Sequence, residues 1–334
     1  MGFIINTMEN MNISLSDVVR FFYFNAILIT ITLNVFPPFA KKLYTYGKNQ
    51  DTRPLKDFDN PKSVDKAKHD DKSKDGDGLF DRWLNLLASL QLPHRYFTHF
   101  YVLSTGLQLF TLIQILTHSR VLTYVLSSLP STSNDEIGPP QQSFESIVLC
   151  IFCMTLQSSR RLYESVYIQL PSPSKMSILI YAAGILHYLF MSLATWCESP
   201  TTLLLTTTNI THPSDLLRPP RINTFLALPC FILATGVQHD AQVYLSSLKK
   251  YSLPTHPLFE YTLSPHYLAE CVVYGSLVVL GAPVGHWVNV TLFYVWVFVC
   301  VNQAFGARIT REWYRNRFGE KAVEGKCSLV PFIF

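Results

Sequence analysis

The sequence predicts an all-α fold, a polytopic bundle of transmembrane helices with about seven spans. Composition gives the first indication: 49% of the 334 residues are hydrophobic and only 15% are charged, whereas soluble domains carry about 25% charged residues. Phe and Tyr are abundant, with 23 and 17 copies, and aromatic residues are enriched at membrane interfaces and in apolar ligand grooves. Several apolar runs also approach the roughly 20 residues that a membrane-spanning helix needs.

Seven apolar segments are candidate spans, and they fall at residues 18–39, 97–117, 144–162, 176–196, 224–245, 267–281 and 286–306. The sixth is short for a full crossing. The sixth segment would pair with the seventh as a tight hairpin around Gly281, Ala282 and Pro283. Because the sixth segment is short, a total of six spans is the alternative.

The chain divides into an N-terminal segment with the first span (1–40), a polar loop (41–95) and a six-span domain (96–334). Residues 51–81 of the loop are rich in Lys and Asp and poor in apolar residues, so they cannot bury enough surface to fold alone. We interpret this loop as cytosolic, partly disordered and without chemistry of its own.

Basic residues predict the orientation, because Lys and Arg favour the cytosolic side. With the N-terminus outside, the four inside segments hold 23 of the 27 Lys and Arg residues. The Asn-x-Ser/Thr sites at Asn12 and Asn209 then lie outside, where glycosylation occurs, whereas Asn289 falls within a span. The C-terminus is therefore expected to be cytosolic.

Charge and cysteine usage argue against other classes of ligand. The net charge of +4 is small and unevenly spread, which does not indicate nucleic-acid binding. Most of the seven cysteines lie in apolar runs and behave as small hydrophobes. Cys150 and Cys153 form an isolated CxxC without a nearby ligand histidine, so no metal site is expected.

Polar groups at the ends of the spans need an explanation, because charged and amide side chains in a membrane are costly and often functional. Five such groups all fall near the cytosolic face: 93–101, 157–164, 238–242, 266–270 and 302–311. For His94 and Arg95, and for Arg160 and Arg161, the alternative is a purely interfacial role.

Helical spacing brings members of these groups onto common faces. Gln157, Arg161 and Glu164 share one face, Gln238 and Gln242 are one turn apart, and so are His266 and Glu270. Convergent polar groups at the cytosolic end of a bundle indicate a pocket for a water-soluble ligand. The apolar spans behind them suit a lipid ligand.

Four segments resemble the steroid 5-alpha-reductase family, and within it the branch that reduces polyprenal. They are 258–270 (LFEYTLSPHYLAE), the tail with Trp313, Tyr314, Phe318 and 329–334 (LVPFIF), 157–164 (QSSRRLYE) and 93–101 (PHRYFTHFY). The resemblance is strong over 248–334, patchy over 93–170 and absent from the first loop.

The resemblance implies a multi-pass reductase of the endoplasmic reticulum membrane that uses NADPH to saturate a carbon–carbon double bond conjugated to a carbonyl. In this branch the substrate is a long isoprenoid lipid, polyprenal. The product, dolichal, leads to dolichol, which carries the glycan for protein N-glycosylation. Membrane lipids are the other expected partners.

The resemblance also implies cofactor-binding positions. These are Glu270, His266, Tyr251, Lys249, Gln238, Gln242 and Tyr314, to which Asn302 of the fifth polar group is added. Two departures argue against a steroid substrate: steroid-reducing members have Asn where His266 stands, and Ser252-Leu253-Pro254 replaces an Arg-x-Pro sequence.

Conjugate reduction needs a hydride at the β-carbon and a donor to the carbonyl oxygen. The candidate donors are Tyr163 and Glu164 on the third span and His99 on the second. Arg161, Lys249 and Arg311 are candidates for the cofactor phosphates. The sequence has no GxGxxG motif after a strand, so a Rossmann-type cofactor site is not expected.

Three alternatives stay open. The first is an enzyme of the same fold acting on a steroid or an enoyl thioester. The second is a transporter or channel, which would distribute polar residues through the membrane depth. The third is a membrane methyltransferase, which would bind a methyl donor at the same cytosolic end.

Overall fold

The computed structural model describes residues 13–35, 90–129, 141–170, 175–209, 220–249 and 252–330. Within these residues, each predicted span corresponds to one long helix. The helices are α2 (Leu15–Val35), α6 (Phe97–Leu116), α8 (Phe144–Tyr163), α9 (Ile178–Ala194), α11 (Ile222–Ser247), α12 (Pro265–Leu280) and α13 (Val290–Phe318). The all-α membrane fold is thereby confirmed.

Helix length and composition support the membrane setting. Four segments are long and apolar enough to cross a bilayer, namely Leu15–Val35, His94–Leu116, Ile222–Ser247 and Val290–Phe318. Ile178–Ala194 and Pro265–Leu280 are shorter apolar helices. The remaining helix, α8, has 20 residues but carries Glu145, Arg160 and Arg161 in its end turns. A total of seven crossings therefore stays a prediction, whereas the multi-pass class is clear.

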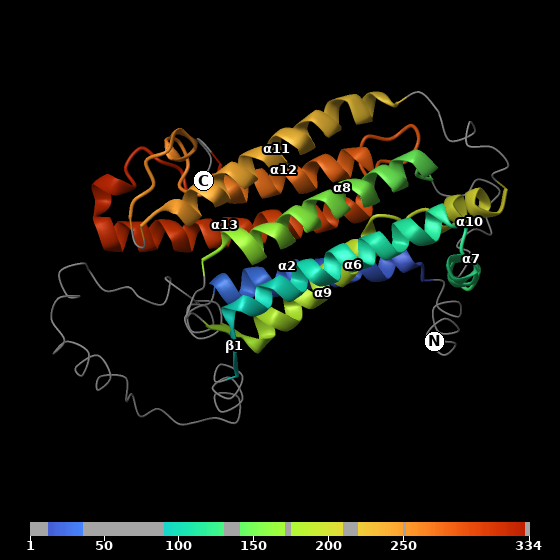
Figure 1. The fold of residues 1–334 in the computed structure, drawn as a ribbon, viewed down its shortest axis with the longest axis horizontal. Helices are drawn as coiled ribbons and strands as arrows, with labels where there is room; N and C mark the ends of the chain where they lie inside the picture. Colours follow the sequence, from blue (N-terminus) through green and yellow to red (C-terminus); the bar gives the residue numbers. More distant parts are fainter. Residues whose placement is uncertain are drawn as a thin grey trace.

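The helices lie side by side and alternate in direction along the chain (Figure 1). At one end of the bundle, called the β1 end, α8, α11 and α13 terminate while α6, α9 and α12 begin. Two short helices, α7 (Arg120–Ser127) and α10 (Pro200–Asn209), lie at the opposite end. The polar groups predicted for the cytosolic face therefore all belong to the β1 end.

Local sequence fixes where several of these helices start. The side chains of Ser143 and Ser177 accept hydrogen bonds from backbone N–H groups in the first turns of α8 and α9. Asn289 does the same for α13, and its amide also donates to the Gly281 carbonyl at 2.9 Å. Such caps satisfy donors that a helix start leaves unpaired. Asn289 is fully buried, so this Asn-x-Thr site has a structural role.

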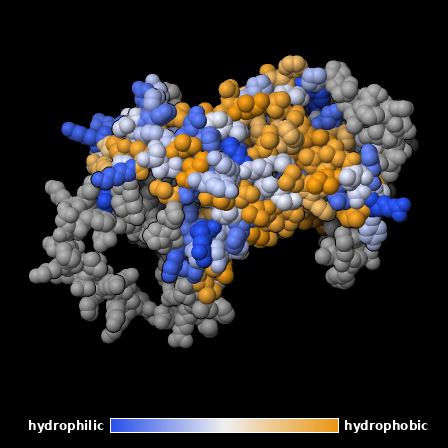
Figure 2. All heavy atoms as spheres, in the orientation of Figure 1, coloured by the Kyte–Doolittle hydropathy of each residue, from blue (hydrophilic) through white to orange (hydrophobic). Residues whose placement is uncertain are grey.

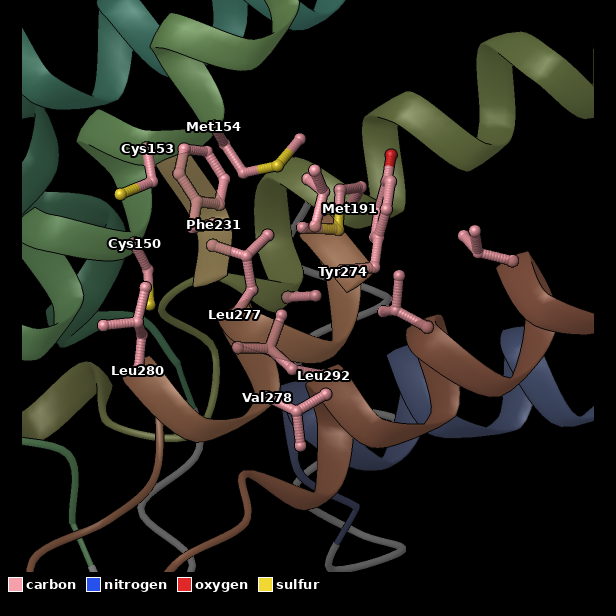
Figure 3. Close-up of a cluster of buried hydrophobic side chains, with 14 of the residues drawn as sticks. Cys150, Cys153, Met154, Met191, Phe231, Tyr274, Leu277, Val278, Leu280 and Leu292 are labelled. Carbon is pink, nitrogen blue, oxygen red and sulfur yellow. The ribbon is translucent and has the colours of Figure 1, made fainter. Parts of the chain in front are cut away.

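The apolar core joins most of the helices, and α12 lies at its centre. Its buried members come from α2, α8, α9, α11, α12 and α13; Figure 3 labels Cys150, Cys153, Met154, Met191, Phe231, Tyr274, Leu277, Val278, Leu280 and Leu292. The strongest helix pairs are α11 with α12 and α6 with α8. This packing holds the helices close together. The polar side chains that they carry at the β1 end therefore lie within reach of one another.

Apolar side chains also gather on the outer surface. Figure 2 shows them over the middle of the bundle, with hydrophilic residues at its two ends. Phe21, Phe225, Ile232 and Leu233 are examples with more than half of their surface exposed. An outward apolar band of this kind suits contact with lipid tails.

Two features at the C-terminal end differ from the sequence prediction. The last helix continues to Phe318 instead of ending near residue 306, because Ala307, Thr310, Trp313, Tyr314 and Arg317 recur at helical spacing and are buried. A C-terminal segment, residues 319–330, then folds back, and Thr262 forms a bridge with Cys327.

Small elements also occur where loops were predicted. Strands β1 (Gln91–Pro93) and β2 (Lys175–Ser177) pair antiparallel, with Leu92 opposite Met176. The 3-10 turn η4 (His94–Tyr96) follows β1. The predicted polar loop 41–95 thus ends in ordered structure, while its residues 41–89, the last residues of the first predicted span (36–39) and Asn12 lie outside the described residues.

Candidate active site

A buried carboxylate, Glu164, is the centre of the polar site at the β1 end. Its side chain has no exposed surface, and it accepts from Arg160, Arg161 and His239, the last through Nδ1 at 2.7 Å. Glu164 opens a π-helical turn (Glu164–Ile168) directly after α8. Such turns often occur at functional sites. Here the turn keeps the carboxylate within reach of both preceding arginines.

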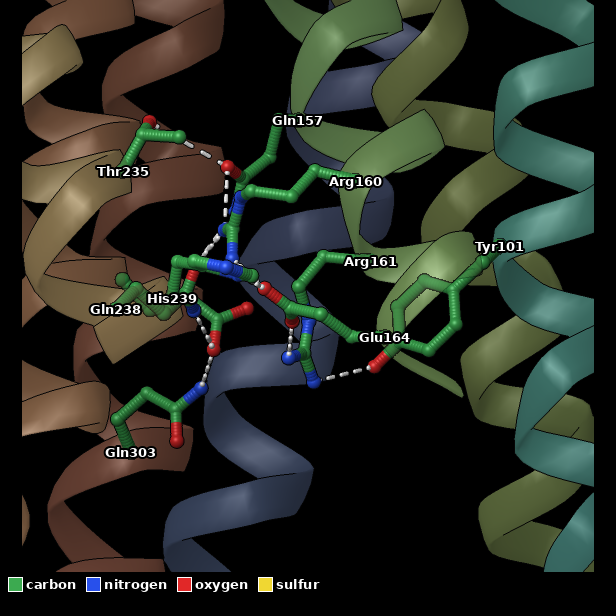
Figure 4. Close-up of polar contacts among 10 residues, drawn as sticks. Tyr101, Gln157, Arg160, Arg161, Glu164, Thr235, Gln238, His239 and Gln303 are labelled. Carbon is green, nitrogen blue, oxygen red and sulfur yellow. Dashed lines mark hydrogen bonds and ion pairs between the residues drawn. The ribbon is translucent and has the colours of Figure 1, made fainter. Parts of the chain in front are cut away.

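Arg161 links this carboxylate to α6. Its Nη2 donates to the Tyr101 hydroxyl oxygen at 2.9 Å, and its guanidinium carbon lies 5.2 Å from the centre of the Tyr101 ring. The Arg161 side chain is only 11% exposed. Arg161 thus satisfies Glu164 on one side and the phenol on the other (Figure 4).

A second carboxylate, Glu270 on α12, is tied to the first through amides. Glu270 Oε2 accepts from Gln303 Nε2 at 2.7 Å and from Gln238 Nε2 at 3.3 Å. Gln238 Oε1 accepts in turn from Gln157 Nε2 at 2.7 Å and from Arg160. One hydrogen-bonded network therefore runs from α6 through α8, α11 and α12 to α13 (Figure 4).

Aromatic hydroxyl and imidazole groups lie deeper in the bundle, next to this network. His187 contacts two phenols: its Nδ1 is 3.2 Å from the Tyr23 hydroxyl and its Nε2 is 3.4 Å from the Tyr274 hydroxyl. The Tyr188 ring lies 5.8 Å from that of Tyr101, in an edge-on arrangement. Hydroxyl groups from α2, α6, α9 and α12 thus extend the polar site into the bundle.

The structure brings together some of the predicted site residues. Glu164, Arg161, Gln238 and Glu270 belong to the network. Gln242 is half-buried one turn beyond Gln238 on α11.

Three further predicted cofactor residues lie at this end of the bundle. His266 lies in the first turn of α12, with its ring 4.2 Å from that of Tyr267. Asn302 is half-buried beside Gln303, and Lys249 is exposed just after α11. Tyr251 lies outside the described residues.

Two predicted catalytic residues lie apart from the network. Tyr163 is 53% exposed and packs against Tyr167, and His99 is exposed, with Nδ1 3.0 Å from the Tyr181 hydroxyl. The reason is helical geometry, because neighbouring residues differ by about 100° in direction. The faces of Glu164 and Tyr101 point inward, and those of Tyr163 and His99 point away from the site.

Arg311 and Tyr314 of α13 hold the C-terminal segment. Arg311 donates to the carbonyl oxygens of Val323, at 3.2 Å, and Lys326. Tyr314 is 3% exposed and packs in a cluster with Leu263, Trp313 and Val323. Both side chains therefore have structural partners within the described chain.

Sequence reasoning left several network residues out of the site. Tyr101, Gln157, Arg160, His239 and Gln303 fell within the polar groups but were not assigned a role. An interfacial role is the sequence-based alternative for Arg160, yet its side chain is 16% exposed and bonded to Glu164. His187 was not singled out, although a histidine in the middle of an apolar span is a recognisable signal.

Comparison with known proteins gives a consistent family. Residues 211–334 match the family model described as 3-oxo-5-alpha-steroid 4-dehydrogenase. The polyprenal reductase of Saccharomyces cerevisiae is 30% identical over 252 residues, which are 75% of this chain and 78% of the relative.

Animal relatives agree. The human polyprenal reductase is 28% identical, covering 74% of this chain and 79% of its own length. That of Caenorhabditis elegans is 23% identical, covering 75% and 82%. The chain therefore belongs to the steroid 5-alpha-reductase family of oxidoreductases, in the branch whose named members are polyprenal reductases.

Proposed function

We propose that this protein reduces the α,β double bond of polyprenal to give dolichal, with NADPH as the hydride source. The observation that carries the proposal is the network of Glu164, Arg161, Gln238, Glu270 and Gln303, which gathers polar groups of four helices at one end of an apolar bundle. Such a site suits a water-soluble cofactor and a lipid whose only polar group is its aldehyde. The names of the relatives support polyprenal over a steroid.

The residues at the β1 end fit a dinucleotide. Gln238, Gln303 and Glu270 offer amide and carboxylate groups of the kind that hydrogen-bond ribose hydroxyls and a carboxamide. Lys249 is exposed at the same end and suits a phosphate. We keep His266, Gln242, Asn302 and Tyr251 as proposed cofactor contacts on the strength of the family resemblance. A reduced nicotinamide, when bound, supplies the hydride that forms the new C–H bond at the β-carbon.

The protein supplies orientation and charge stabilisation. As the hydride arrives, negative charge develops on the carbonyl oxygen, so donors fixed in advance lower the barrier. Arg160 and Arg161 are fixed donors because Glu164 holds both of them. Glu164 thus acts through the two arginines, which makes it a positioning residue. The apolar side chains around the site keep the local dielectric constant low, which strengthens each of these interactions.

The setting we propose is the endoplasmic reticulum membrane, with the β1 end and the C-terminus in the cytosol. The positive charges of the loops support this orientation. Dolichol formed from the product would serve protein N-glycosylation. NADPH is soluble in the cytosol, so a site at the β1 end can exchange it without a path through the membrane.

The test is turnover by the full-length protein, purified in detergent, with polyprenal and either NADPH or NADH. We expect NADPH consumption with a lipid product two mass units heavier that retains its aldehyde. Deuterium at C4 of the nicotinamide should appear at the β-carbon. Turnover of a 3-oxo-Δ4 steroid but not of polyprenal would discard the substrate, and inactivity with both would overturn the proposed function.

A further inference from the structure

We infer that Tyr101 donates the hydrogen bond that stabilises the carbonyl oxygen of the substrate during hydride transfer. This inference rests on the proposed function and names a reacting residue for it. Tyr101 lies in α6, within the segment Pro93–Tyr101 that resembles the polyprenal-reducing branch. It is buried, with 8% of its surface exposed, and adjoins the charged network.

The direction of the Arg161–Tyr101 hydrogen bond is the first argument. A guanidinium has only donors, so the phenolic oxygen of Tyr101 accepts from Arg161 Nη2 at 2.9 Å. This contact does not use the hydroxyl proton of Tyr101. That proton is left to donate, and an aldehyde oxygen can only accept. Tyr101 and the substrate carbonyl are therefore complementary.

Charge is the second argument. The guanidinium of Arg161 lies 5.2 Å from the ring centre and is bonded to the hydroxyl oxygen. Its positive charge stabilises electron density that moves onto the phenolic oxygen as the hydrogen bond to the substrate tightens. Arg161 is itself held by Glu164. The series runs from the Glu164 carboxylate through the Arg161 guanidinium and the neutral Tyr101 phenol to the substrate oxygen, and it needs no reorganisation when negative charge develops there.

Ring packing is the third argument. The Tyr101 ring meets Tyr188 edge-on at 5.8 Å, and Tyr188 meets His187 at 5.0 Å. The other two candidate donors, His99 on α6 and Tyr163 on α8, are exposed. Of the three, only Tyr101 is buried in the bundle, where an apolar substrate would present its aldehyde.

The chemistry balances with one hydride and one proton. The hydride, which a bound reduced nicotinamide would supply, forms the C–H bond at the β-carbon. The electrons of the C=C bond then shift toward the α-carbon and the carbonyl oxygen, giving an enolate that Tyr101 stabilises by its hydrogen bond. A proton from water completes the C–H bond at the α-carbon. Tyr101 ends the reaction with its own proton.

The experiment compares Tyr101→Phe with wild-type full-length protein in detergent. Phenylalanine keeps the ring contacts with Arg161 and Tyr188 and removes only the hydroxyl. Loss of one oxyanion donor lowers kcat about 100- to 1,000-fold, so we expect that loss while the dissociation constant of NADPH stays within roughly twofold. Tyr124→Phe is the matched control, since Tyr124 is 69% exposed in α7 at the opposite end. A kcat for Tyr101→Phe near that of the control would overturn the inference.

A second readout does not depend on turnover. The carbonyl stretch of bound saturated aldehyde, isolated with a ¹³C label in an infrared difference spectrum, should lie at lower frequency in wild-type protein than in Tyr101→Phe. Equal frequencies would contradict a hydrogen bond from Tyr101. If wild-type protein binds the aldehyde but does not reduce polyprenal, the proposed function fails while this comparison still decides the role of Tyr101.

Discussion

Arg161 and Glu164 lie three residues apart at the end of α8 and form an ion pair inside the bundle, with side chains 11% and 0% exposed. The same carboxylate also contacts Arg160 and His239, so it is the shared acceptor for three neighbouring side chains of the site. Glu164 therefore influences both folding and the geometry of the donors.

Replacement of Glu164 by Gln should destabilise the protein strongly. Removing one partner of a buried ion pair costs about 3–5 kcal/mol, because the remaining charge is left uncompensated. We expect a clear fall in the thermal midpoint in detergent, together with loss of turnover. Glu312→Gln is the control, since its pair with Arg308 is 53–55% exposed and exposed pairs contribute about 0–1 kcal/mol. Equal midpoints for the two variants would contradict the assigned role.

Replacement of Glu270 by Ala should abolish measurable cofactor binding. Glu270 fixes the amides of Gln238 and Gln303, so its loss removes a proposed contact and disorders two others. Hydrogen bonds to charged groups contribute about 1.5–3 kcal/mol each, which corresponds to a decrease in affinity of roughly 100-fold or more. A calorimetric titration of the purified protein with NADPH measures this change in affinity. Unchanged affinity would remove Glu270 from the cofactor site, and Glu312→Ala provides the baseline.

The spacing of α6 and α9 depends on Gly184. A Cβ atom at this position would lie 2.6 Å from Phe100 Cζ, so the ring would have to move, and Phe100 precedes Tyr101. Overpacking of this kind costs about 1–3 kcal/mol. We expect Gly184→Ala to lower both the thermal midpoint and kcat. Gly236→Ala on α11 is the opposite case, because an added Cβ would meet no described atom within 4 Å beyond the adjacent residues and backbone of its own helix, and Ala favours the helix. A Gly184→Ala variant with a higher thermal midpoint than wild type would contradict this prediction. It would show that α6 and α9 can move apart without loss of stability.

Arg311 allows a phosphate-binding role to be separated from a structural one. It donates to two carbonyls of the segment 319–330, so Arg311→Ala should release this segment from α13. We expect a lower thermal midpoint without cofactor and faster proteolysis after residue 318. Arg308→Ala, at an exposed ion pair, should leave both unchanged. If Arg311→Ala instead keeps its stability and only weakens NADPH relative to NADH, the arginine binds the 2′-phosphate.

Much of the architecture could be predicted from the sequence. The seven apolar runs coincide with α2, α6, α8, α9, α11, α12 and α13, because the length of an apolar run is set by bilayer thickness and needs no tertiary information. The collection of polar groups at one end followed from their positions along alternating helices. The seventh run was predicted too short, since burial of Trp313 and Tyr314 by the C-terminal segment extends α13 beyond the apolar stretch.

The inward faces of the helices were decided only by the tertiary structure. Helical spacing placed Gln157, Arg161 and Glu164 together. It could not tell which residue of α6, Tyr101 or His99, would point into the bundle. The same uncertainty held for Glu164 and Tyr163 at the end of α8. In a soluble helix the polar face marks the outside, whereas in a membrane both the lipid-facing and the core-facing sides are apolar. The sequence thus determined the spans, the end at which the site lies and the family chemistry. The packing of α6, α8, α11, α12 and α13 determined which side chains point into the bundle, because the rotation of each helix about its axis is fixed by its neighbours.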